Sequence, residues 1–245
     1  MFERTRDYPT ALTSSSAGNA DAVKAAVSWL LTKAREIGGQ PLLYFPGKSN
    51  MSAEPLLEQL SQRVSTATWR TLRGGKVGWS GGVVLAAWPD EQHLAEIADD
   101  RRTKGLVVLA WSDKDVAGWA AAAQPEVLNP DVEVGTASVC DPVVAKGLET
   151  LTALVNHGNA LAGTLDRRDA IMVLQKLHDG GHRLDPDEVY AWSLAHGWPA
   201  RGALRLKEIA SRIAAGSRPH PPSPSALRPD ILSVWRAQVA GEAQE

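Results

Sequence analysis

Two kinds of hydrophobic pattern divide the chain. In the first half, apolar residues follow one another without interruption in short runs: PLLYF at 41–45, VVLAAW at 83–88 and LVVLAW at 106–111. Continuous runs of this length are typical of strands covered on both faces, as in parallel sheets. Residues 19–39 and 52–64 repeat apolar positions at helical spacing. The pattern predicts an α/β region with flanking helices and a small, mostly parallel sheet of about three to five strands.

Two of these runs lie in stretches that nearly copy each other, GGVVLAAWPD at 81–90 and KGLVVLAWSD at 104–113. Each is followed by a helical pattern, so each predicts a strand-to-helix unit. Asp90 and Asp113 stand where helix N-caps belong, and aspartate there accepts backbone N–H bonds and complements the helix dipole. By the same reasoning, Asn19 and Ser52 are predicted to cap the other two helices.

The second half of the chain has only helical patterns. Four helices are predicted, at 141–158, 166–181, 185–197 and 200–216, because Asp or Pro opens three of them and Gly closes all four. A stretch rich in Pro and Ser follows, and residues 229–240 read as a short amphipathic helix. The predicted organisation is a flexible N-terminal arm (1–19), an α/β domain (20–140), a helical domain (141–216) and a linker with a short C-terminal helix (217–245).

Composition and charge exclude several classes of protein. The 245 residues are 44% hydrophobic and 22% charged, with a net charge of -2, which is ordinary for a globular domain and argues against steering by nucleic acid or an anionic membrane over the whole surface. One cysteine excludes an internal disulfide. With no secretory signal and no apolar run of membrane-spanning length, we expect a cytoplasmic protein without a membrane partner. Abundant Ala and Arg suggest a bacterial source.

The strand ends predict a candidate ligand site. In an open parallel sheet, ligands bind at the carboxyl ends of the strands. If the strands are neighbours, two indoles at matching ends could stack on a planar ligand, with a lysine to meet an anion and carboxylates to accept hydrogen bonds. The alternative is that both indoles pack against the following helices. The predicted ligand-binding residues are Lys48, Ser49, Trp88, Asp90, Trp111 and Asp113, with Ser112 between the last two.

Three other groups of residues are weaker candidates for a catalytic or binding site. FPGKSN at 45–50 resembles a phosphate loop, but Leu42 stands where the first glycine of such a loop belongs. Two interpretations of this segment remain: a simple anion contact by Lys48, or a tight turn with an exposed lysine. Cys140 precedes a helix start and is better explained by packing than by reactivity. His178 and His182 flank Gly-Gly and do not share a helical face. We therefore expect no catalytic residues, no metal and no cofactor.

The pair of helices at 185–216 has the outline of a helix-turn-helix. Positive charge collects there, with Glu208 the only acid between 196 and 218, and a basic stripe could touch phosphates. The alternative is an ordinary structural hairpin, since few residues suited to reading bases lie on the second helix. The predicted nucleic-acid-binding residues are Arg201, Arg205, Lys207, Arg212 and Arg218.

These patterns predict a cytoplasmic bacterial binding or regulatory protein without catalysis of its own, whose helical half engages nucleic acid or a protein partner. The alternative is an enzyme or a sensor of a small, nucleotide-like ligand that works at the strand ends. This alternative ranks second because a carboxylate serving as an N-cap is a poor general acid.

Overall fold

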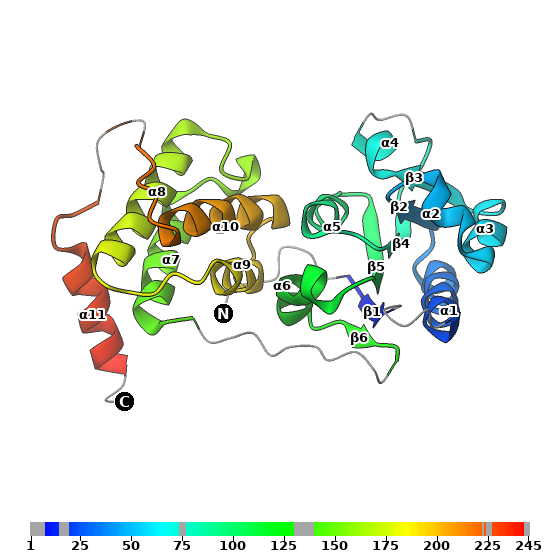
Figure 1. Cartoon of the computed structure of the whole chain (residues 1–245), viewed down its shortest axis with the longest axis horizontal. Coiled ribbons are helices and arrows are strands. Elements are labelled where there is room, and N and C mark those ends of the chain that lie inside the picture. Colours follow the sequence, from blue (N-terminus) through cyan, green and yellow to red (C-terminus); the bar gives the residue numbers. More distant parts are fainter. Residues whose placement is uncertain are drawn as a thin grey trace. The chain divides into compact units, whose positions relative to one another are not determined.

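The computed structural model describes residues 8–14, 20–73, 77–129, 140–221, 223 and 227–242. The chain divides into two compact units, an α/β unit within residues 6–135 and a helical unit within residues 136–245 (Figure 1). Each unit has its own hydrophobic core. The predicted change from strand–helix alternation to helices alone therefore corresponds to the boundary between the two units.

The α/β unit is built on a six-stranded sheet in the order β3-β2-β4-β5-β1-β6, with every paired strand parallel. This confirms the predicted fold class, with more strands than expected. Both central runs are buried along their length, which explains why they are apolar without alternation. The strands are β1 (Thr10–Ser14), β2 (Leu42–Phe45), β3 (Ser65–Thr68), β4 (Gly82–Ala87), β5 (Thr103–Ala110) and β6 (Glu126–Val127).

Helices cover both faces of this sheet. Helix α1 (Ala20–Ile37) packs on β4, β5 and β1, and α3 (Pro55–Ser61) packs beside it in the same core. Helices α5 (Glu91–Ala98) and α6 (Asp113–Ala123) contact each other and β5 on the opposite face (Figure 1). Two short helices follow strands directly, α2 (Lys48–Ser52) after β2 and α4 (Trp69–Arg73) after β3.

The expected flexible arm at 1–19 is wrong for residues 10–14, which form β1. This strand pairs with β5 and β6, and Ala11 and Leu12 are buried. Its last two residues are polar but buried, and the Thr13 hydroxyl lies 2.9 Å from the Asn129 side-chain oxygen. This strand was not predicted from the sequence because its threonine and serine residues leave it without a continuous apolar run. The rest of the predicted arm within 1–7 and 15–19, with the predicted cap Asn19, lies outside the described residues.

The predicted helix caps are only partly correct. Asp90 caps α5 as expected, since its carboxylate accepts a 2.8 Å hydrogen bond from the backbone N–H of His93. Asp113 is instead the first helical residue of α6, and Ser112, with an extended backbone, is the N-cap. Ser52 is the last residue of α2. Because Pro55 opens α3, the cap position falls on Glu54, whose side chain makes no capping bond.

The helical unit contains the four predicted helices and the C-terminal helix: α7 (Pro142–Leu154), α8 (Thr164–Asp179), α9 (Pro186–Ala195), α10 (Ala200–Ala214) and α11 (Ile231–Glu242), with a 3-10 turn at His157–Asn159. Helix α11 packs on α7, and Trp235 is only 1% exposed in the shared core. The C-terminal helix is therefore an integral part of the helical unit rather than an appendage to a linker. Within the described residues, no helix is both long and apolar enough to cross a membrane.

Candidate functional site: a pocket walled by tryptophans

The connections of β2 and β4 create a crevice at the carboxyl edge of the sheet. After β2 the chain passes through α2 and α3 on the α1 face, whereas after β4 it passes to α5 on the opposite face. Because β2 and β4 are neighbours, the two connections diverge and leave the strand ends uncovered. Such a switch point is where open α/β sheets bind their ligands.

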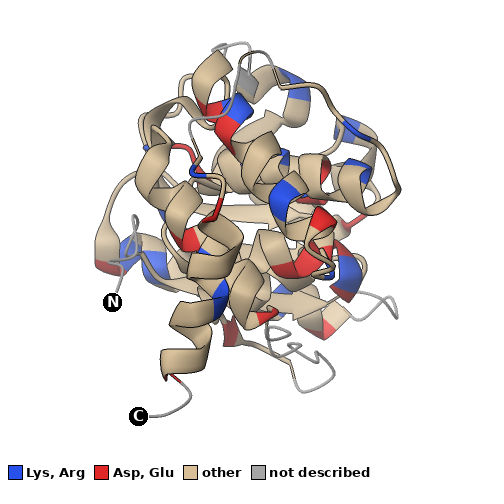
Figure 2. Cartoon of the chain, turned by 90° about the vertical axis from the view of Figure 1, so that its left-hand side faces the viewer, with Lys and Arg blue, Asp and Glu red and all other residues tan. Residues whose placement is uncertain are grey.

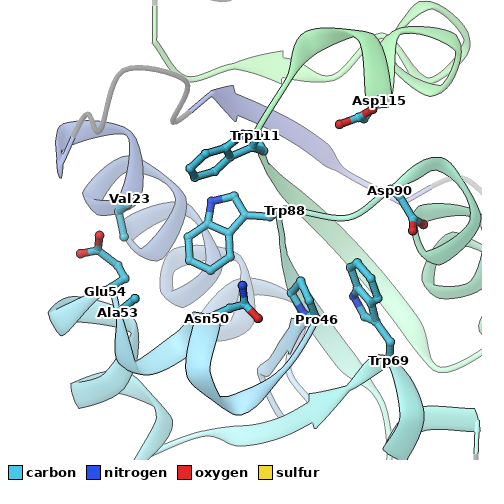
Figure 3. A pocket seen from close by; sticks show the side chains of 10 residues that line it. All are labelled: Val23, Pro46, Asn50, Ala53, Glu54, Trp69, Trp88, Asp90, Trp111 and Asp115. Atoms are coloured by element: carbon cyan, nitrogen blue, oxygen red, sulfur yellow. The ribbon is translucent and has the colours of Figure 1, made fainter.

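A pocket of about 600 Å³ opens at this edge, within the size range of small-molecule sites (Figure 3). Its walls come from the ends of β2, β4 and β5 and from the helices α1, α2, α4 and α6 with their adjoining turns. The described residues that line it are Val23, Pro46, Asn50, Ala53, Glu54, Trp69, Trp88, Asp90, Trp111 and Asp115.

Trp88 and Trp111 are each the first residue after a strand, and the two strands, β4 and β5, are neighbours in the sheet. The backbone N–H of Trp88 donates a 2.7 Å hydrogen bond to the carbonyl of Leu109, so this residue is still paired to β5. Its φ of 53° is left-handed, uncommon for a bulky residue, and turns the chain out of β4. Trp111 is 67% exposed although it is the largest type of side chain. The indoles are therefore not both packed beneath the following helices.

Trp69, at the start of α4, is a pocket residue that the sequence pattern did not reveal. Its ring stacks on that of His93, with 3.6 Å between ring centroids and 15° between ring planes. The Nδ1 atom of His93 lies 2.6 Å from the Asp90 carboxylate. These contacts join α4 to the start of α5 beside the pocket. Recognition of β3 in STAT would have placed Trp69 at the same sheet edge.

The structure brings only some of the predicted ligand-binding residues together. Trp88, Asp90 and Trp111 line the pocket, whereas Lys48 lines a separate hollow of about 420 Å³ beside β3. Ser49 is exposed on α2, and neither it nor Asp113 is among the described residues that line the tryptophan pocket. Gly47 and Lys48 form a tight turn into α2, and Lys48 is exposed.

In the helical unit, several of the predicted nucleic-acid-binding residues are engaged within the protein. Lys207 forms a 2.6 Å ion pair with Asp187, and Arg218 forms a 2.8 Å ion pair with Asp179. Arg205 donates to the carbonyl of Ala160 at 2.7 Å. Basic and acidic positions are interspersed over the ribbon (Figure 2). The stripe expected from the sequence is therefore partly neutralised.

One group of arginines does share a hollow. Arg167 of α8 joins Arg205 and Arg212 of α10 around a groove of about 340 Å³, which Glu208 also lines. Arg167 was not predicted, because the sequence pattern considered one helix at a time. Arg201 is exposed at the start of α10, outside this groove's described lining.

Cys140 belongs to the core of the helical unit. Burial, with Glu188, Asp141 and Asp185 nearby, raises the pKa of its thiol to about 12, which suppresses the reactive thiolate. The Nδ1 atom of His182 lies 3.1 Å from the Asp141 carboxylate, and its Nε2 atom accepts a hydrogen bond from the Arg236 guanidinium. Across the described ranges, no cluster of His, Cys, Asp and Glu could hold a metal ion.

Comparisons with known proteins concern the second half of the chain most directly. A family model described as "Domain of unknown function (DUF1889)" matches residues 140–236, which lie within the helical unit. A crystal structure of a protein from Salmonella typhimurium is similar over 40% of this chain and 98% of its own, with 21% sequence identity and a TM-score of 0.36. The comparison with curated proteins gives no match.

Proposed function

We propose that the α/β unit binds a small organic ligand in the tryptophan pocket. The observation that carries this proposal is the exposure of Trp111, which stands 67% exposed beside a pocket that it shares with Trp69 and Trp88. Exposed indole surface is costly in water, and grouped aromatic residues around a concave site at a sheet switch point are typical of ligand recognition. Stacking on an indole face suits a planar or compact apolar group.

The arrangement supports binding more directly than catalysis. Asp90 is tied to the start of α5 by its bond to the His93 backbone, and its carboxylate also meets the imidazole. Both contacts hold the carboxylate in a fixed position at the pocket, which reduces the entropy lost when a ligand binds. The α/β unit would thus act as the ligand-sensing part of a binding or regulatory protein.

Labelling the full chain with 5-fluorotryptophan tests this proposal by ¹⁹F NMR. With indole, adenosine and choline as probes, we expect at least one to shift the resonances of Trp69, Trp88 and Trp111. The resonances of Trp79, Trp198 and Trp235, which are buried elsewhere, should stay in place. Trp111→Leu should weaken binding about tenfold, because one stacking wall is lost. If no probe moves the three pocket resonances, or if the resonances of Trp79, Trp198 and Trp235 move as far as these three, the pocket is not the binding site.

A second candidate function rests on the arginine groove of the helical unit. Three guanidinium groups from two helices around one hollow could hold phosphates of a nucleic acid, as the basic segment at 201–218 suggested. Glu208 in the same lining and the ion pairs of Lys207 and Arg218 oppose this function. It therefore ranks below the pocket, and the sequence-based preference for the helical half is reversed.

Titration of labelled duplex DNA at about 50 and 200 mM salt tests the second candidate. Three phosphate contacts predict a loss of about 40-fold in affinity over this range. Arg167→Ala and Arg212→Ala should each weaken binding at low salt, whereas Arg218→Ala, already paired with Asp179, should change it little. Absence of binding at low salt, or equal effects of the three variants, would rule out the groove.

A further inference from the structure

The charge of the tryptophan pocket is one-sided. Three of its described lining residues are acids, Glu54, Asp90 and Asp115, and none is Lys, Arg or His. Such a bias is local, because the whole chain carries a net charge of only -2. It also differs from the arginine groove, where both signs meet.

Three basic residues on elements around the pocket are engaged or directed elsewhere. Lys24 on α1 forms a 2.9 Å ion pair with Asp21, and Lys48 lines the neighbouring hollow. His93 lies against Asp90, but its ring is stacked on Trp69 and its Nδ1 atom is occupied by that carboxylate. A ligand in the pocket therefore meets indoles and carboxylates.

Indole faces and carboxylates attract the same kind of ligand. The electron-rich face of tryptophan is the best aromatic partner for a cation, and groups of aromatic residues are the usual means of recognising quaternary ammonium ions. A carboxylate within a few ångströms adds Coulomb attraction. A phosphate or carboxylate ligand would face three like charges with no described counter-charge in the lining.

We infer that the pocket recognises a small organic cation, namely an alkylammonium group held between Trp69, Trp88 and Trp111. Asp90 and the other two acids supply its counter-charge. This inference rests on the proposed function and names the ligand class for that same site. It replaces the nucleotide-like ligand suggested by the sequence, for which Lys48 was expected to meet an anion.

Choline and 3,3-dimethyl-1-butanol test the inference, because they share shape and differ in charge. In ¹⁹F NMR titrations of the fluorotryptophan-labelled full chain, choline should shift the three pocket resonances with an affinity at least about tenfold higher than that of the neutral alcohol. Trp111→Leu and Asp115→Asn should each weaken choline binding several-fold. Both side chains are exposed, so neither change should disturb folding. Lys48→Ala, beside the neighbouring hollow, should leave choline binding unchanged.

The outcomes separate the cation inference from the proposed function. Equal affinities for choline and the alcohol, or no effect of Asp115→Asn, overturn the inference but leave the pocket as a ligand site. Tighter binding of adenosine monophosphate than of adenosine overturns it as well, because the pocket would then accept an anion. If choline, the alcohol, indole and adenosine all leave the pocket resonances unmoved, both proposals fall. A trimethyl-lysine peptide that binds more tightly than choline would place the ammonium group on a protein partner.

Discussion

Trp235→Ala should destabilise the helical unit by about 3–5 kcal/mol. Trp235 is only 1% exposed, within the core where α11 packs on α7. Its indole N–H donates a 2.8 Å hydrogen bond to the hydroxyl of Thr150. Truncation removes the largest fully buried side chain of the chain's described part and leaves a cavity that the helices cannot close. Urea unfolding followed by far-UV circular dichroism measures this loss.

Two variants separate packing from the hydrogen bond. Trp235→Phe retains most of the buried ring and should cost less than the alanine change. Thr150→Val keeps the shape of the threonine but leaves the indole N–H buried without an acceptor, at a cost of about 1–3 kcal/mol. A loss below about 1 kcal/mol for Trp235→Ala would mean that α11 contributes little to the stability of this unit.

The fold was predictable where hydrophobic patterning was strong. The runs at 41–45, 83–88 and 106–111 became β2, β4 and β5, because central strands of a doubly covered sheet must be apolar on both faces. Strands β1, β3 and β6 escaped prediction. The first ends in Thr and Ser that are buried, STAT of β3 is mostly polar, and β6 has only two residues. These strands form because they pair with strands from other parts of the chain, so their own residues do not predict them.

The candidate site was predictable in the same uneven way. Strand ends and sheet topology brought Trp88, Asp90 and Trp111 to one edge, since parallel strands carry their ends to the same side. Lys48 starts a short helix after β2 and lines the neighbouring hollow instead. Trp69 was missed because it follows β3, which has no hydrophobic run of its own. Glu54 was missed for a different reason: it immediately precedes α3, and only strand ends were considered as places for a ligand site.

Gly39→Ala should destabilise the α/β unit by about 3 kcal/mol or more, whereas Gly38→Ala should cost about 1 kcal/mol. Both glycines have a left-handed backbone, with φ of 89° at Gly39 and 80° at Gly38, so both substitutions carry the conformational penalty. A Cβ at Gly39 would lie 2.6 Å from the carbonyl oxygen of Gly81, while one at Gly38 would meet nothing within 4 Å. The difference between the two variants therefore measures the steric clash alone.

The clash falls on the contact that aligns the starts of β2 and β4. The backbone N–H of Gln40 donates a 2.9 Å hydrogen bond to the same Gly81 oxygen, and the carbonyl of Gln40 accepts one of 2.6 Å from the Trp79 indole. Moving Gly81 away from a new Cβ would weaken this junction at the amino edge of the sheet. Because the tryptophan pocket lies at the carboxyl edge, the Gly38→Ala variant should fold and keep the pocket intact. Equal losses of unfolding free energy in the two variants, measured in urea, would show that the close approach of the Gly39 and Gly81 backbones does not constrain the fold.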